Sequence, residues 1–227
     1  MSRTALIDID GTLVDSNYQN AIAWDRAFRT QGLTLPLWQL HRHLGMGGDQ
    51  FVAAVAGDDV ERTSGAALRD EWKRQFQEFL DEIRPANGAR PLLERLRRDG
   101  WTTVLASSGA ADHTDHYLDL LAARDLLDGW TTSADVDATK PSPDLLHVAL
   151  DKAGGGDAVL IGDSPWDVEA ARRAGLPTIC VLTGGFAESE LLDAGASRVF
   201  RSLADLRDEL SELPVAAAAK VRRSRAG

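Results

Sequence analysis

The sequence predicts an α/β fold in which helices flank a parallel sheet and a helical segment is inserted after the first strand. Short apolar runs alternate with amphipathic segments through most of the 227 residues, which is the pattern of strands joined by crossover helices. Between Asp15 and about Pro85 this alternation disappears and the apolar periodicity is helical throughout. With 44% hydrophobic residues, the chain can bury a core and suits one large domain with an insertion.

Six apolar runs are the expected strands of the sheet. They are residues 5–7, 102–106, 129–132, 158–161, 178–182 and 198–200. The expected helices between them are residues 90–98, 112–123, 143–153 and 165–174. Gly100, Gly154 and Gly175 follow three of these helices and are suitable helix ends, because glycine adopts the left-handed conformation without a steric penalty.

The predicted organisation has two units and a tail. Residues 1–15 and 86–213 are expected to form the α/β core, residues 16–85 a helical insertion, and residues 214–227 a disordered basic tail. Ser16 is a candidate N-cap at the start of the insertion. Apolar side chains at helical spacing form two stripes in it: Ala21, Trp24 and Phe28, and Trp72, Phe76, Phe79, Leu80 and Ile83. We expect core packing from both stripes rather than contact with a ligand.

Composition narrows the class of partner. The net charge of -10 argues against broad electrostatic binding to nucleic acid or to anionic lipid, so phosphate recognition would need a local site. The one cysteine, Cys180, lies in an apolar run, where a buried structural thiol is expected. A signal peptide and a membrane-spanning run are not recognisable, and we expect a cytoplasmic protein.

Two carboxylates directly follow the first predicted strand. In an extended segment alternate side chains share a face, so Asp8 and Asp10 point the same way while Ile9 turns toward the core. Gly11 then permits a backbone turn. Two neighbouring acids repel each other, which predicts a cation or a shared proton between them. Turns and calcium loops also contain Asp and Gly, but the calcium-loop register fails at the two positions after Gly11.

Three later segments bring polar groups to the same edge of the sheet. Ser107 and Ser108 follow the second long strand, Lys140 precedes a helix, and Asp163 follows another strand with Asp167 one helical turn later. The ligand crevice of an open parallel sheet lies beyond the carboxyl ends of its strands. Taken alone, each group could be a surface cation, a helix cap or a strand end, and their joint position favours a site.

In order and in local sequence these motifs resemble those of the haloacid dehalogenase superfamily, most closely its branch related to β-phosphoglucomutase and phosphoglycolate phosphatase. The resemblance covers about residues 5–206. It implies a Rossmann-like parallel sheet core with a helical cap inserted after the first strand, and it makes residues 16–85 the cap. It also implies that Asp8 is a nucleophile and Asp10 an acid/base, and that Ser107, the chain at Ser108, and Lys140 bind a phosphoryl group.

The resemblance further implies a magnesium ion. A dianionic phosphate needs a hard cation with oxygen ligands before it approaches ionised carboxylates. Asp8 and Asp163 would ligate this ion through side chains and Asp10 through its backbone carbonyl, whereas Asp167 would act outside the first coordination shell or orient Lys140.

A glycine-rich stretch of the cap is the candidate substrate loop. Gly45, Gly47 and Gly48 would face the substrate, although a simple turn between helices explains them equally well. The residues just before this loop, His41, Arg42 and His43, are candidates for substrate selection. Three histidines on predicted core helices are expected to be surface or packing residues: His113, His116 and His147.

Departures from the relatives favour one reaction. Asn20 stands about where the mutase has a histidine, the loop at residues 45–49 lacks an arginine for a second phosphate, and Asp10 is an acid that true dehalogenases lack. We therefore expect a magnesium-dependent phosphatase that acts on a small phosphorylated metabolite through an aspartyl-phosphate, as a monomer or weak dimer. The alternatives are a sugar-phosphate mutase and a non-catalytic protein that binds phosphate esters.

Overall fold

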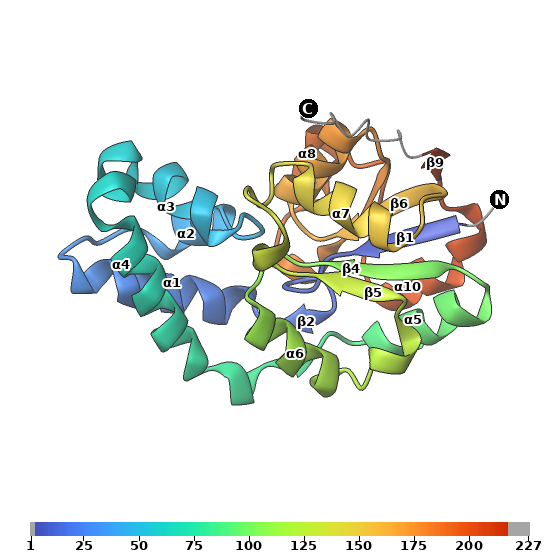
Figure 1. Cartoon of the computed structure of the whole chain (residues 1–227), viewed down its shortest axis with the longest axis horizontal. Coiled ribbons are helices and arrows are strands. Elements are labelled where there is room, and N and C mark those ends of the chain that lie inside the picture. The colour runs from blue at the N-terminus through green and yellow to red at the C-terminus, as the bar shows by residue number, and fades with distance from the viewer. Residues whose placement is uncertain (1–2, 218–227) are drawn as a thin grey trace, which may run out of the picture.

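A parallel sheet of six strands lies at the centre of the core, in the order β5-β4-β1-β6-β7-β8. Figure 1 labels β5, β4, β1 and β6 of this sheet. The computed structural model describes residues 3–217. The strands are β1 (Arg3–Ile7), β4 (Thr102–Ala106), β5 (Gly129–Thr131), β6 (Asp157–Gly162), β7 (Thr178–Val181) and β8 (Arg198–Phe200). Leu6 of β1 pairs with Val104 on one side and Leu160 on the other. The predicted strands are confirmed, with small differences at their ends.

Helices cover both faces of the sheet because each strand alternates its apolar side chains between the faces. The core helices are α5 (Ala89–Arg98), α6 (Ala111–Leu120), α7 (Asp144–Lys152), α8 (Pro165–Ala174), α9 (Glu188–Ala194) and α10 (Leu203–Asp208). Ile7 belongs to an apolar cluster with side chains of α5, α6 and α10, and Leu6 belongs to another with side chains of α7 and α8. This is the predicted Rossmann-like α/β core, with α9 and α10 in addition to the expected helices.

Short turns of 3-10 helix connect several of these elements. They are η1 (Leu80–Glu82), η2 (Arg124–Leu126), η3 (Ser133–Asp135), η4 (Leu182–Gly184) and η5 (Leu210–Glu212). Cys180 is buried in β7 with a free thiol, as expected. Across residues 3–217, every helix is too short or too polar to cross a membrane.

Four helices of the inserted segment form a lobe beside the sheet (Figure 1). They are α1 (Asn17–Thr30), α2 (Leu37–Arg42), α3 (Gly48–Ala56) and α4 (Asp58–Gln77). The lobe, which we call the cap, has its own apolar cluster that includes Phe28, Phe51 and Leu68. Phe76 and Ile83 belong instead to the cluster of the core, so the end of α4 and the segment after it seat the cap on the core.

The chain passes from core to cap and back again at two neighbouring segments, and a short antiparallel ladder joins these segments. β2 (Val14–Asp15) pairs with β3 (Arg84–Pro85), and the unit boundaries proposed from the sequence lie at this ladder. Sequence periodicity missed both strands because each has two residues. Ser16 stands at the N-cap position of α1, as predicted, but its hydroxyl makes no cap hydrogen bond and instead donates to Asp10 over 2.6 Å.

Part of the disordered tail expected over residues 214–227 forms a short strand instead. β9 (Ala216–Ala217) pairs antiparallel with the start of β6, with Ala216 opposite Ala158. Alanine offers little surface to bury, but its backbone can complete a ladder at a sheet position that β7 leaves open. The rest of the predicted tail, residues 218–227, lies outside the described residues.

Candidate active site

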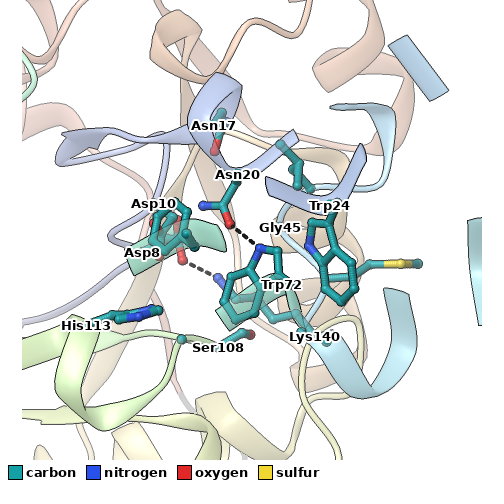
Figure 2. A pocket seen from close by; sticks show the side chains of 16 residues that line it. Asp8, Asp10, Asn17, Asn20, Trp24, Gly45, Trp72, Ser108, His113 and Lys140 are labelled. Atoms are coloured by element: carbon teal, nitrogen blue, oxygen red, sulfur yellow. Dashed lines mark hydrogen bonds and ion pairs between the residues drawn. The ribbon is translucent and has the colours of Figure 1, made fainter. Parts of the chain in front are cut away.

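The turn after β1 places two carboxylates at the carboxyl end of the sheet, beside a cavity (Figure 2). The carbonyl of Ile9 accepts backbone hydrogen bonds from Leu13 over 2.8 Å and from Val14 over 3.1 Å. Gly11 has a φ of 79°, which favours glycine. A Cβ at Gly11 would lie 2.5 Å from an oxygen of Asp163. The glycine is therefore needed both for the turn and for the approach of the two acidic segments.

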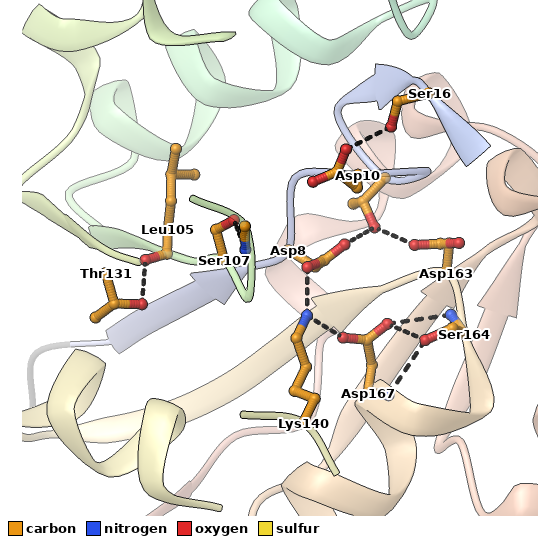
Figure 3. A network of polar contacts seen from close by, with 12 residues as sticks. Asp8, Asp10, Ser16, Leu105, Ser107, Thr131, Lys140, Asp163, Ser164 and Asp167 are labelled. Atoms are coloured by element: carbon orange, nitrogen blue, oxygen red, sulfur yellow. Dashed lines mark hydrogen bonds and ion pairs between the residues drawn. The ribbon is translucent and has the colours of Figure 1, made fainter. Parts of the chain in front are cut away.

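A buried lysine links two of the acids. Lys140 is 1% exposed, and its Nζ forms ion pairs with Asp8 and, over 2.8 Å, with Asp167 (Figure 3). Burial acts to lower the pKa of Lys140, but the charges of Asp167 and Asp8 outweigh burial and raise this pKa above its usual range. The second oxygen of Asp167 accepts from the hydroxyl of Ser164 over 2.6 Å. Lys140 is therefore a fixed cation whose position depends on Asp167.

Three carboxylates share this small volume. One oxygen from each of Asp8, Asp163 and Asp167 lies within 4.8 Å of the others. Burial raises the pKa of Asp8 to about 7 despite the nearby Lys140, and burial together with the charges of Asp167 and Asp8 raises the pKa of Asp163. The single positive charge of Lys140 cannot neutralise three carboxylates. The all-oxygen donor set fits Mg²⁺, which prefers carboxylate ligands.

Asp10 is oriented by two hydroxyl groups. Its Oδ1 accepts from Ser16 over 2.6 Å and from Tyr117 of α6 over 3.1 Å. Its carboxylate does not belong to the group of three acids found among residues 3–217, so the side chain is separate from the expected metal ligands. Tyr117 was missed by sequence reasoning, because a buried tyrosine on an amphipathic helix gives no sign of the partner that its hydroxyl will find.

The two serines after β4 differ in their surroundings. The Oγ of Ser107 is buried and accepts from the backbone N–H of Gly109 over 2.9 Å. Ser108 lines the cavity, and its Oγ lacks a hydrogen-bond partner in the described part of the chain. A ligand in the cavity could therefore satisfy Ser108, whereas Ser107 supports the turn beside it.

The cavity lies between core and cap and has a volume of about 70 Å³. Of the residues that the sequence analysis proposed as catalytic, phosphate-binding, metal-binding or substrate-loop residues, seven line it: Asp8, Asp10, Gly45, Gly47, Gly48, Ser108 and Lys140. Asp163 and Asp167 are buried behind this lining. The lining residues for which sequence analysis proposed no contact with a ligand include Asn17, Trp24, Trp72, Phe76 and His113.

Aromatic rings form the cap side of the cavity. Trp72 stacks on Trp24 with ring centroids 5.3 Å apart and on Phe76 at 5.5 Å. The indole Nε1 of Trp72 donates to Oδ1 of Asn20 over 3.2 Å, as Figure 2 shows. Both aromatic stripes pack in the interior, as expected, and three of their rings, Trp24, Trp72 and Phe76, also line the cavity.

His113 of α6 adds a polar group from the core side. Its side chain lies against the rings of Trp72 and Phe76, with centroid distances of 5.8 and 5.1 Å. It is 3% exposed, and its Nε2 has no hydrogen-bond partner among the described residues. Burial lowers the pKa of His113, which favours the neutral imidazole. A role in packing was predicted, but the residue also lines the cavity.

The three residues proposed for substrate selection lie at the contact between cap and core, away from the cavity lining. Nε2 of His41 lies 3.0 Å from the carbonyl oxygen of Gly184, and Arg42 forms an ion pair of 3.3 Å with Glu190. His43 stacks on Trp166, with ring centroids 5.7 Å apart. The prediction that His41, Arg42 and His43 select the substrate is therefore not supported by their positions, and they hold the cap against the core.

Replacing Gly47 by alanine is expected to lower kcat/KM. A Cβ at Gly47 would lie 1.8 Å from Oγ1 of Thr139, the residue before Lys140, so the loop must withdraw. A misplacement of about 1 Å can cost about a hundredfold in rate, and we expect a loss of about 10- to 100-fold. The matched variant Gly48→Ala meets nothing closer than 3.4 Å and should lose less. Equal steady-state kinetics for the two variants would contradict this account of the loop.

The fold and the site together define a capped α/β enzyme whose acids and one buried lysine meet at the carboxyl end of the sheet. A family model of haloacid dehalogenase-like hydrolases matches residues 3–175. The chain belongs to the haloacid dehalogenase-like hydrolase family, as the motifs predicted.

Individual relatives agree with this assignment. The chain is 30% identical over 200 residues to a validoxylamine A 7'-phosphate phosphatase of Streptomyces hygroscopicus subsp. limoneus, covering 83% of this chain and 90% of the relative. It is 32% identical over 193 residues to a phosphoglycolate phosphatase of Nitrosospira multiformis, covering 80% and 84%. The crystal structure of a hydrolase from Pseudomonas syringae superposes with a TM-score of 0.88 at 32% identity, covering 93% of this chain and 99% of that one.

Proposed function

We propose that the protein is a magnesium-dependent phosphatase that hydrolyses a small phosphate monoester through an aspartyl-phosphate. The observation that carries this proposal is the meeting of Asp8, Asp10 and Lys140 on one cavity, with Asp163 and Asp167 directly behind it. The phosphatase names of two relatives support the same reaction class.

In the first step, a carboxylate oxygen of Asp8 forms a bond to phosphorus as the bond to the ester oxygen breaks. Asp10 gives its proton to the departing oxygen. The hydroxyls of Ser16 and Tyr117 hold Asp10 in place through one of its oxygens, which leaves the other for this transfer. Lys140 offsets negative charge on the phosphoryl oxygens as a fixed cation, and Ser108 can donate to them.

In the second step, a water molecule attacks the phosphorus of the aspartyl-phosphate and gives a proton to Asp10. The bond from phosphorus to Asp8 breaks, its electron pair returns to the carboxylate, and inorganic phosphate leaves. The acid of the first step thus becomes the base of the second, and the enzyme returns to its starting state.

Asp8 and Asp163 would hold Mg²⁺ through side chains and Asp10 through its backbone carbonyl. Asp167 would instead position Lys140, because one of its oxygens bonds Lys140 and the other accepts from Ser164. When bound, the ion supplies positive charge that offsets repulsion between the substrate phosphate and the carboxylates.

A screen of phosphorylated metabolites for inorganic phosphate release, with Mg²⁺ and with a chelator, tests the proposal. Magnesium-dependent release of inorganic phosphate is the expected result. Recovery of an isomer with its phosphate at a new position would overturn the proposal in favour of a mutase. Tight binding of esters without turnover over hours would overturn it in favour of a binding protein.

A further inference from the structure

We propose that the alcohol part of the substrate is an uncharged ring that carries hydroxyl groups, and that Asn20 and His113 recognise these hydroxyls beside the indole of Trp72. A monophosphate of a cyclitol or sugar belongs to this class, whereas an ester with a carboxylate or a second phosphate does not. The inference rests on the phosphatase function proposed above and extends it to the leaving group.

The charges of the cavity argue against a second anion on the substrate. Among the described residues that line it, the acidic and basic side chains other than His113 are Asp8, Asp10 and Lys140. Lys140 already pairs with two carboxylates and is committed to the reacting phosphoryl group. A carboxylate or second phosphate in this cavity would meet two acids and no available cation.

The space next to the cavity is also unfavourable for a second anion on the substrate. A second hollow of about 320 Å³ shares Gly48, Trp72 and Ser108 with the cavity, so a leaving group too large for 70 Å³ can extend along Trp72 into it. Its two cations are already paired, Arg69 with Glu61 and Lys73 with Asp112. Three acids also line it: Asp49, Asp70 and Asp137. A second anion on the substrate would therefore find no unpaired cation among the described residues that line this hollow.

The aromatic rings supply an apolar face to the same path. Trp24 and Trp72 lie nearly parallel, with an angle of 17° between their planes. The indoles pack mainly on one another and on neighbouring rings, but both also line the cavity. The apolar C–H groups of a saturated ring can contact the indole atoms that face the cavity.

Two polar groups are oriented to recognise hydroxyls. Trp72 donates to Oδ1 of Asn20, so the amide NH2 of Asn20 is the donor left for the cavity. Nε2 of His113 has no partner in residues 3–217 although the side chain is almost fully buried. A buried nitrogen without a partner has lost its hydrogen bonds to water, and a substrate hydroxyl would replace them. A hydroxyl suits both groups because it can accept from Asn20 and can donate to or accept from the imidazole.

The purified protein of 227 residues should be assayed with Mg²⁺ and a matched set of phosphate esters. Inositol monophosphate and glucose monophosphate carry uncharged hydroxylated rings, cyclohexyl phosphate lacks the hydroxyls, and phosphoglycolate and a hexose bisphosphate carry a second anion. We expect kcat/KM for a hydroxylated ring to exceed that for the other esters by about 10-fold or more. Equal or faster turnover of phosphoglycolate or the bisphosphate would overturn the inference alone. Failure to hydrolyse any ester would overturn the proposed phosphatase function instead.

Variants of His113 separate recognition from structure. His113→Phe keeps an aromatic ring against Trp72 and Phe76 but removes Nε2, and should reduce the preference for inositol monophosphate over cyclohexyl phosphate by about 10-fold. His113→Gln retains a polar group and should restore part of this preference. His147→Phe, a histidine of α7 outside the cavity lining, should leave the ratio unchanged. An unchanged ratio in folded His113→Phe, or the same loss in His147→Phe, would overturn the role of His113.

Discussion

Replacing Asp8 by asparagine is expected to abolish release of phosphate from every ester while the protein remains folded. An amide lacks the anionic oxygen that would attack phosphorus, and loss of a nucleophile lowers turnover by about a thousandfold or more. The fold should persist because Lys140 retains its ion pair with Asp167 and one buried negative charge is removed from a crowded group. Turnover should be followed by inorganic phosphate release and folding by thermal melting.

Asp15→Asn is the matched control for this variant. Asp15 is an exposed acid of the β2–β3 ladder, close to Asp8 in sequence and outside the cavity lining. It should retain wild-type turnover under the same conditions. Turnover of Asp8→Asn within tenfold of wild type, with an intact melting transition, would reject the assignment of Asp8 as the nucleophile.

Asp163→Asn is expected to stabilise the metal-free protein and to lower turnover in the presence of magnesium. In the metal-free protein Asp163 is buried beside Asp8 and Asp167, and these surroundings oppose its ionisation. A neutral isostere removes this repulsion, so in chelator at about pH 8 the melting temperature should rise by about 2 to 6 °C. With Mg²⁺ the variant should lose a ligand, and its turnover should fall by at least about a hundredfold.

The hydrogen bonds of Asp163 make this substitution a fair test. Thr12 donates to one of its oxygens over 2.9 Å and Asn17 to the other over 3.0 Å. An amide can keep both contacts if its oxygen accepts from Asn17 and its nitrogen donates to Thr12, whose hydroxyl can then donate to Asp8.

Magnesium should raise the melting temperature of wild type and not that of Asp163→Asn, because a ligand stabilises only the state that binds it. The control Asp193→Asn, at an exposed acid of α9, should respond to Mg²⁺ as wild type does. A lower melting temperature of Asp163→Asn in chelator would contradict the repulsion between the buried acids, and an unchanged response to Mg²⁺ would show that Asp163 is not a metal ligand.

Sequence patterns predicted the core well because they report burial along regular elements. The alternation at β1 reflects the real difference between Leu6 and Ile7, which pack on opposite faces of the sheet. Spacing also predicted the approach of Asp8 and Asp163, because β1 and β6 are neighbours and their carboxyl ends meet at one edge. The two-residue strands β2 and β3 escaped detection because they are too short to show periodicity.

Other parts of the site depend on tertiary contacts that sequence spacing does not encode. Tyr117 and His113 lie on the same helix and are both buried, yet only the packing of α6 directs one to Asp10 and the other to the cavity. Trp72 likewise belongs to one apolar stripe of the sequence, but in the fold its indole both stacks on Phe76 and donates a hydrogen bond to Asn20. Serine is a residue type that often caps helices, but the hydroxyl of Ser16 donates to the nearby carboxylate of Asp10 instead of capping the backbone of α1.

The side chain of Asn17, the first residue of α1, connects the cap to the acidic site of the core. Its amide nitrogen donates both to Asp163 and to the carbonyl of Gly184 over 3.1 Å. His41 of α2 contacts that same carbonyl. A rotation that carries α1 outward would break one of the two hydrogen bonds that orient Asp163. If Asp163 binds a cation as proposed, lobe closure and cation affinity would be thermodynamically linked, and each would strengthen the other to the same extent.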